Sequence, residues 1–444
     1  MQRSRPQRAL WLALALILLL GLAAVFLGLF RATSVTEAVA RPLSEDEVRE
    51  LLPRGRQLAM AGDCFGCHSK PEGPRAAGGV ALATPFGTLY STNITPDPEH
   101  GIGRYTRADF HRALLDGVAK GGRNLYPAMP YVFTHRTTAA DVDALYAYMM
   151  SIPPIAEADT PPTGIYRLPV RGFMNFWNLL NFPGRDAVSA PAPAVSEAAP
   201  ERADQWVRGA YLVEGLAHCA ACHTPMNVTM GTDFSRHFQG AVIDGMQAPD
   251  IRAETLGRQG FDLDSLTRFL RTGVSPQGSS FAGMYTVTHA STSDMRVEDV
   301  EAMAVYLLTG EDGVIVPADA PPRPWKAAAS LADSAELTAG RLAYLSACAG
   351  CHGLAGEGIP NVAPAMRGNA TLINDDPRNF VKVVLEGIPA QRFAGNQRMD
   401  AMPGFADQLS DEAIARLTNW SRGQWGGQAP AATEDTVRKL RKAP

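Results

Sequence analysis

The pattern of apolar and polar positions is most uneven at the N-terminus. An uncharged, leucine-rich run of 22 residues extends from Ala9 to Phe30, with arginines on both flanks. Since about 20 apolar residues in a helix cross the hydrocarbon core of a bilayer, the run predicts a transmembrane helix. The basic flank before it favours a cytoplasmic N-terminus and places the rest of the chain outside the cytoplasm. The triplet Ala38–Ala40 resembles a cleavage site but lies beyond the run, so we expect residues 1–31 to remain as a membrane anchor.

Downstream, the apolar positions repeat with helical periodicity in three similar segments. Each segment opens with a short helical pattern that contains one glycine and closes with a helix that carries an apolar stripe. Residues three apart lie on one face of a helix, so each stripe predicts a surface that packs against the opening helix. The stripes are Val142, Leu145 and Tyr148; Val300, Met303 and Tyr306; and Ile414, Leu417 and Trp420. The glycines are Gly55, Gly209 and Gly340.

The starts and ends of these segments can also be read from the chain. Ser44, followed by Glu47 three residues later, predicts a capping box at the start of the first opening helix. Residues 152–164 contain four prolines, and residues 187–203 and 316–329 are rich in proline and alanine, as linkers are. We therefore predict an all-α fold with three consecutive domains after the N-terminal transmembrane helix. The predicted domains span residues 41–152, 204–312 and 334–425.

Two further segments lie outside this repeated plan. Residues 165–185 are aromatic and apolar, which indicates either a strap packed on a domain surface or a contact with a partner or a membrane. Residues 426–444 end in basic side chains and are predicted to be a mobile, solvated tail. The formal net charge of the chain is only −4, which argues against a nucleic-acid partner.

One five-residue motif, Cys-x-x-Cys-His, occurs once in each predicted domain. Its two cysteines, one helical turn apart, can each form a thioether to one porphyrin, and the adjacent histidine can bind the iron. The motifs therefore predict three covalently bound haem c groups. The cysteines that would hold them are Cys64, Cys67, Cys219, Cys222, Cys348 and Cys351, and the proximal iron ligands would be His68, His223 and His352.

Other chemistries for these motifs fit less well. All six cysteines of the chain lie in the motifs, so no thiol is left over for a disulfide. A zinc site would need four ligands from paired Cys/His knuckles, and three such stretches do not divide into sites of that kind. A thioredoxin-like pair would be expected once, near a βαβ pattern, and none is visible.

The second axial ligand of each iron is predicted to be methionine, whose thioether raises the potential of a cytochrome c. Met129 and Met284 each follow their motif histidine by 61 residues (129 − 68 and 284 − 223), and Met402 follows His352 by 50 (402 − 352). We predict that these three methionines complete the iron sites. Most methionines in a protein only fill the core, so position in the chain alone does not identify a ligand. Four other methionines are alternative candidates for the second axial ligand. They are Met246, Met295, Met366 and Met399, of which Met399 is the strongest because it lies three residues from Met402.

The residues around the first two motifs carry a family resemblance. Thr84–Asp97, followed by Gly101–Gly103 and Leu125–Tyr131, resembles the first domain of the trihaem cytochrome c subunits of bacterial membrane-bound dehydrogenases. Arg208–Glu214, which runs into His218–Pro225, resembles their second domain, and the third domain is similar to a more general cytochrome c. The resemblance implies three class I-like cytochrome c domains. It also implies a partner, a catalytic subunit of quinoprotein, flavoprotein or molybdenum type that oxidises alcohols, aldehydes, gluconate or sugars and whose electrons pass toward ubiquinone.

The predicted function is an electron relay on the periplasmic side of the bacterial inner membrane, and not an enzyme on its own. With one methionine available per domain, every iron would be six-coordinate, so no substrate could bind to the metal. A haem enzyme of the peroxidase type would instead need one iron with an open position. A cytochrome subunit of a terminal oxidase would use the same chemistry with a different partner.

Overall fold

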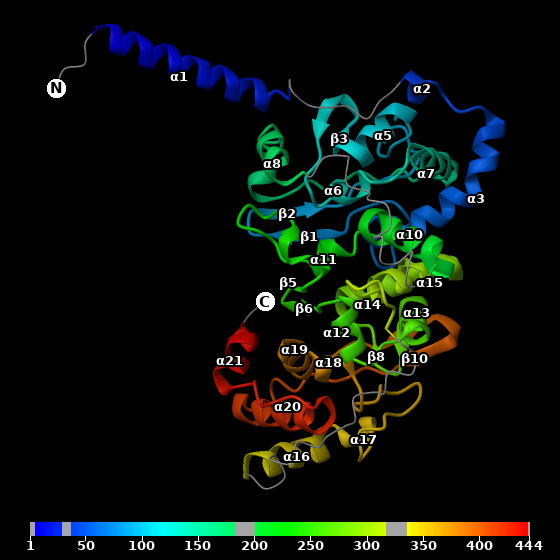
Figure 1. Cartoon of the computed structure of the whole chain (residues 1–444), viewed down its shortest axis with the longest axis vertical. Coiled ribbons are helices and arrows are strands. Elements are labelled where there is room, and N and C mark those ends of the chain that lie inside the picture. The colour runs from blue at the N-terminus through cyan, green and yellow to red at the C-terminus, as the bar shows by residue number, and fades with distance from the viewer. Residues whose placement is uncertain (1–4, 29–36, 183–199, 317–334, 443–444) are drawn as a thin grey trace. The chain divides into compact units, whose positions relative to one another are not determined.

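The computed structural model describes residues 5–28, 37–182, 200–316 and 335–442, which form two compact units, within residues 1–188 and 189–444. The first unit holds the first predicted domain, and the second unit holds the other two. Helices dominate each unit, and short antiparallel strand pairs lie between helices along the chain (Figure 1).

The first unit contains the opening helix α3, the motif helix α4 and the closing helix α7, with hairpins and shorter helices between them. Its helices are α1 (Arg5–Phe26), α2 (Glu37–Ala40), α3 (Glu45–Ala61), α4 (Cys64–His68), α5 (Arg107–Asp116), α6 (Tyr131–Thr134), α7 (Ala139–Ser151) and α8 (Phe173–Asn181). Its strands are β1 (Ala81–Thr84), β2 (Gly87–Tyr90), β3 (Val118–Ala119) and β4 (Arg123–Asn124).

The second unit repeats this order twice. Its first half contains α10 (Ala203–Tyr211), α11 (Ala220–His223), β5 (Ala241–Ile243), β6 (Met246–Ala248), α12 (Ala253–Arg258), α13 (Leu263–Thr272), β7 (Val274–Ser275), β8 (Gly278–Ser279), α14 (Ala282–Ala290) and α15 (Val297–Leu308). Its second half contains α16 (Ala335–Ala347), α17 (Ala349–His352), α18 (Ala370–Ile373), α19 (Arg378–Glu386), β9 (Gln391–Phe393), β10 (Gln397–Met399), α20 (Asp411–Gly426) and α21 (Glu434–Lys442).

In each domain the opening helix packs directly on the closing helix, in the pairs α3 with α7, α10 with α15, and α16 with α20. The predicted glycines lie at these crossings. A Cβ atom on any of them would lie closer than 3.0 Å to a carbonyl oxygen of the closing helix, a separation that real Cβ atoms essentially never show. The glycine and carbonyl pairs are Gly55 with Ala144, Gly209 with Ala302, and Gly340 with Arg416. The helix axes can therefore approach this closely only because the side chain is absent.

The predicted apolar stripes face the same crossings. The first two residues of each stripe are at most 1% exposed: Val142, Leu145, Val300, Met303, Ile414 and Leu417. The third residue of each stripe has its Cβ beside the crossing glycine: Tyr148, Tyr306 and Trp420. The predicted packing of closing helix on opening helix is confirmed.

The predicted capping box at the start of α3 is also confirmed. The backbone N–H of Ser44 donates to Glu47 Oε2 at 2.7 Å, and the N–H of Glu47 donates to Ser44 Oγ at 3.3 Å. These two bonds satisfy donors that a free helix end would leave to water.

The predicted N-terminal transmembrane helix is wrong. Helix α1 ends at Phe26, before the apolar run ends, at a turn in which Gly28 takes a φ of +71°. The part of α1 after Arg8 therefore extends over only ~27 Å at the ordinary helical rise, against a hydrocarbon core of about 30 Å. Within the described ranges, no helix is both long enough and apolar enough to cross a membrane.

The all-α prediction also needs correction, because five two-stranded antiparallel sheets occur among the described residues. The longest pairs Ala81–Thr84 with Gly87–Tyr90, in the loop that follows the first motif. Its turn includes Gly87 at a φ of +133°, a conformation that favours glycine. Such loops lack helical periodicity, so their backbone groups find partners across short hairpins instead.

The C-terminal segment is not the mobile tail that its composition predicts. Helix α21 packs on the third domain, where Val437 is fully buried and Leu440 is 6% exposed. Arg441 donates from Nε to Asp411 Oδ1 at 2.7 Å and from Nη2 to the carbonyl of Leu409 at 3.0 Å. Arg441 therefore ties α21 to the start of α20 and to Leu409 shortly before it.

Helix α8 forms the predicted strap over the first domain. Asn178 Oδ1 accepts from the hydroxyl of the buried Tyr131 at 2.8 Å, and the ring of Phe173 packs edge-on against Phe26 of α1 at 5.3 Å. The far side of the helix leaves Leu179 and Leu180 exposed. The strap interpretation therefore holds for one face of α8.

Replacing Gly209 by alanine tests the crossing. We expect Gly209→Ala to destabilise the second domain by about 1–3 kcal/mol, because the new methyl group would displace α15. The control is Gly283→Ala in α14, where a Cβ would meet no atom within 4 Å. Thermal unfolding of the two variants should show a lower midpoint only for Gly209→Ala. Equal midpoints would contradict this account of the fold.

Candidate functional site

Each Cys-x-x-Cys-His motif forms a short helical turn after the opening helix, and in the second domain a π-helix, Leu212–Leu216, lies between the two. In the first two domains the residue before the first cysteine has a left-handed backbone, Asp63 with a φ of +47° and His218 with a φ of +39°. This conformation interrupts the helix, so the motif begins a new turn in its own direction. Asp63 is 7% exposed, and burial raises the pKa of its carboxyl group to about 7.

Each of the three motif histidines makes the same kind of hydrogen bond. In each, Nδ1 lies within hydrogen-bond distance of a backbone carbonyl: His68 with Thr92 at 2.6 Å, His223 with Pro249 at 2.7 Å, and His352 with Pro364 at 2.9 Å. A carbonyl can only accept, so Nδ1 carries the proton and Nε2 keeps its lone pair for a metal. Burial lowers the pKa of all three imidazoles, which favours the neutral form that binds iron.

Sequence reasoning missed the three carbonyl acceptors. They follow their histidines by 24, 26 and 12 residues, so no common interval marks them. Two of the three are prolines, Pro249 and Pro364, but the chain has 33 prolines and nothing singles these two out. Only the folded loops show which carbonyl reaches each ring.

The cysteines of each motif differ in exposure. The second one is exposed in every motif, whereas the first is less accessible. Burial raises the pKa of the first thiol to about 12 at Cys64 and Cys219 and to about 11 at Cys348. These thiols are therefore protonated at neutral pH, and no nucleophilic thiolate chemistry is indicated for them.

The three predicted methionine ligands are all half-buried and lie in different local structures. Met129 occupies a turn, where its N–H donates to Tyr126 and its carbonyl accepts from Tyr131. Met284 lies in the first turn of α14, two residues after Ala282, which takes a φ of +49°. Met402 pairs with Ile388 through two backbone hydrogen bonds of 2.9 Å. Their role as iron ligands stays a prediction.

The four rival methionines differ from one another in burial. Met295 and Met366 are 5% and 6% exposed, and Met366 packs in the core of the third domain. Met246 and Met399 lie half-buried on strands β6 and β10. Met399 therefore remains the rival of Met402.

The donor set fits haem c in every domain. Each motif offers two thiols one helical turn apart and an imidazole whose Nε2 is available, and each domain has a half-buried thioether from a separate segment. Bound at such a site, haem supplies reversible one-electron exchange.

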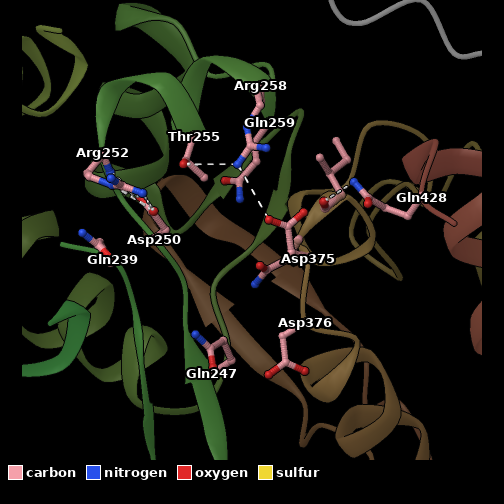
Figure 2. Close-up of a pocket in the computed structure, with 12 residues that line it drawn as sticks. Gln239, Gln247, Asp250, Arg252, Thr255, Arg258, Gln259, Asp375, Asp376 and Gln428 are labelled. Carbon is pink, nitrogen blue, oxygen red and sulfur yellow. Dashed lines mark hydrogen bonds and ion pairs between the residues drawn. The ribbon is translucent and has the colours of Figure 1, made fainter. Parts of the chain in front are cut away.

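A polar cleft of about 210 Å³ lies between the second and third domains, inside the second unit. Figure 2 shows Asp250 and Arg252 on the second-domain side and Asp375 on the third-domain side. Arg252 pairs with Asp250 at 2.5 Å, and Arg258 reaches Asp375 at 3.9 Å. Because these charges compensate one another, the cleft is better described as an interdomain seam than as a ligand site.

Two family models match parts of the chain. The model described as "Cytochrome c" matches residues 52–153, and the model described as "Cytochrome C oxidase, cbb3-type, subunit III" matches residues 335–420. These ranges cover the first and third motifs.

Curated relatives match most of the chain. The cytochrome c subunit of the quinone-type alcohol dehydrogenase of Gluconacetobacter polyoxogenes is 34% identical, over 92% of this chain and 88% of that protein. The gluconate 2-dehydrogenase cytochrome c subunit of Pantoea cypripedii is 35% identical, over 90% and 92% respectively. A subunit of the nicotinate dehydrogenase of Pseudomonas putida is 39% identical over 86% of this chain, which spans only 31% of that protein.

Paired substitutions in the third domain test the methionine prediction. We expect Met402→Ala to open the distal position of the third haem, so that the reduced protein binds carbon monoxide there and the potential of that haem falls. Met399→Ala, three residues away, is the matched control and should do neither. Optical spectra with carbon monoxide and a redox titration would decide, and the reverse result would make Met399 the ligand. The same substitutions of Met129 and Met284 test the other two domains.

Proposed function

The chain belongs to the family of dehydrogenase cytochrome c subunits, and from that premise we propose that it carries three haem c groups, which relay electrons from a dehydrogenase catalytic subunit to ubiquinone. As a member of this family it is an electron-transfer subunit and not the catalytic one. Its cofactor is covalently bound haem c.

The observation that carries the proposal is the threefold repetition of one proximal site. Three motif histidines donate from Nδ1 to a backbone carbonyl at 2.6 to 2.9 Å, although the loops that provide these carbonyls differ in length. A histidine tied in this way is oriented and made more basic, as metal-bound histidines are. A merely structural histidine would not need the same hydrogen bond in three separate domains. The second domain, which neither family model covers, has it as clearly as the other two.

The partner proposed for the chain follows from its relatives. Alcohol, gluconate and fructose dehydrogenases each have a cytochrome subunit that aligns with 90–93% of this chain. We therefore propose a separate catalytic subunit that oxidises an alcohol, aldehyde, sugar or sugar acid. We also propose that the haem domains lie on the periplasmic side of the bacterial inner membrane, together with this dehydrogenase partner.

A second candidate is a cytochrome subunit of a terminal oxidase. It is favoured by the oxidase subunit III model that matches residues 335–420. That match is confined to the third domain, whereas the dehydrogenase subunits align over 84–92% of their own length. The dehydrogenase partner is therefore the first choice.

The cofactor count is tested on the purified protein. We expect three haems per chain by the pyridine haemochrome assay, none of which is extracted by acidified acetone, because each is held by thioethers. The double variant Cys219→Ala/Cys222→Ala should contain two haems. A wild-type ratio near two would refute the assignment of the second motif.

The relay itself is tested by co-purification in mild detergent. We expect a large dehydrogenase subunit to remain bound, and its substrate to reduce all three haems and then a soluble ubiquinone analogue. The Cys219→Ala/Cys222→Ala variant should still bind the dehydrogenase but lose most quinone reduction. Co-purification with oxidase subunits and no dehydrogenase would favour the second candidate.

A further inference from the structure

A buried asparagine supports each loop whose carbonyl accepts from a motif histidine. The three are Asn93, Asn379 and Asn369, which are 2%, 7% and 9% exposed. Each makes side-chain hydrogen bonds to backbone groups, and each either belongs to the loop that carries the carbonyl or bonds directly to it. The asparagines therefore brace the loops that orient the proximal histidines.

In the first and third domains the asparagine lies close in sequence to the carbonyl that accepts from the motif histidine. Asn93 directly follows Thr92, and its Nδ2 donates to the carbonyls of Ile155 at 2.8 Å and Glu157 at 3.0 Å. Asn369 Nδ2 donates to the carbonyl of Ala365 at 3.0 Å, one residue after Pro364. Each of these haem sites is thus supported by its own domain.

In the second domain the brace comes from a different domain. Asn379 belongs to α19 of the third domain, and it makes a reciprocal pair with Gln247 of β6. The Gln247 N–H donates to Asn379 Oδ1 at 2.7 Å, and Asn379 Nδ2 donates to the Gln247 carbonyl at 2.8 Å. Gln247 lies two residues before Pro249, the acceptor of His223. Gln247 also lines the interdomain seam, between the two domains that Figure 2 shows.

The third domain also contacts the segment that carries Met284, the predicted second ligand of this site. Tyr285, next to the predicted ligand Met284, donates from its hydroxyl to the carbonyl of Arg392 at 3.0 Å. Its ring packs edge-on against Phe393 of β9 at 5.5 Å. The loop whose carbonyl accepts from His223 and the segment that carries Met284 are therefore both tied to the third domain.

We propose that the third domain positions both axial ligands of the second haem, with Asn379 as the positioning residue on the proximal side. This inference rests on the proposed function, since it assumes a haem at each motif. The physical link is the hydrogen bond from His223 Nδ1 to Pro249. Donation to a firmly held carbonyl makes the imidazole more basic, which stabilises ferric iron and lowers the potential.

The test is Asn379→Ala in the full chain with all haems attached. We expect the potential of the second haem to rise, because β6 and the Pro249 carbonyl lose their brace, and the potential of the third haem to stay unchanged. The second haem is identified as the potential that is absent from the Cys219→Ala/Cys222→Ala variant. Hydrogen exchange should also be roughly tenfold faster at the Gln247 amide, which loses its acceptor.

The matched control is Asn419→Ala in α20 of the same domain. Asn419 also bonds backbone groups through its side chain, but those groups are Ala431 and Ala432 of the third domain itself. This variant should lose stability without moving the second potential. A general loosening of the third domain would therefore be separated from a specific effect on His223.

An unchanged second potential in folded Asn379→Ala protein would overturn the proposal, as would a shift confined to the third haem. If that variant does not fold, Tyr285→Phe replaces it. It removes one hydroxyl, and it should lower the second potential by loosening the thioether segment; no change would overturn the proposal. A wild-type protein without haem at the second motif would instead refute the proposed function, so the two failures are distinguishable.

Discussion

Each domain depends on a helix crossing that only glycine permits. The opening helix lies so close to the closing helix that a Cβ at Gly55, Gly209 or Gly340 would overlap a carbonyl oxygen. The close approach buries the apolar stripe of the closing helix and fixes the end of the opening helix. In the first and third domains the Cys-x-x-Cys-His motif starts within three residues of that end, so the crossing there also helps to determine where the motif points.

The helix that follows this crossing positions the proximal histidine. In the first two domains a left-handed residue directly precedes the motif, the motif forms a new turn, and its histidine reaches a carbonyl of the following loop. That bond selects the tautomer, and burial keeps the ring neutral. A histidine prepared in this way can bind iron with little rearrangement, which suits electron exchange because small geometric change keeps the reorganisation cost low.

The first and second domains differ in whether the hydrogen bonds that support the proximal loop come from the same domain or from another one. The first domain supports its own carbonyl through Asn93 and the proline-rich segment near Ile155. The second domain relies on the third, through Asn379 below its proximal loop and the β9 strand beside Tyr285. Paired domains of this kind can keep two redox centres in a constant relation, since neither domain can rotate without breaking these hydrogen bonds.

The sequence by itself determined the repeated elements: the three motifs, the glycines, the stripes and the capping box. These are set by local spacing and by periodicity, so a linear pattern reveals them. It misjudged features that depend on where a segment ends or packs, such as the helix that stops at Phe26, the strand pairs, and the C-terminal helix anchored through Arg441 to Asp411. Only the tertiary structure decided which carbonyl meets each histidine and which asparagine holds it, because those partners come from loops of unequal length and, at His223, from another domain.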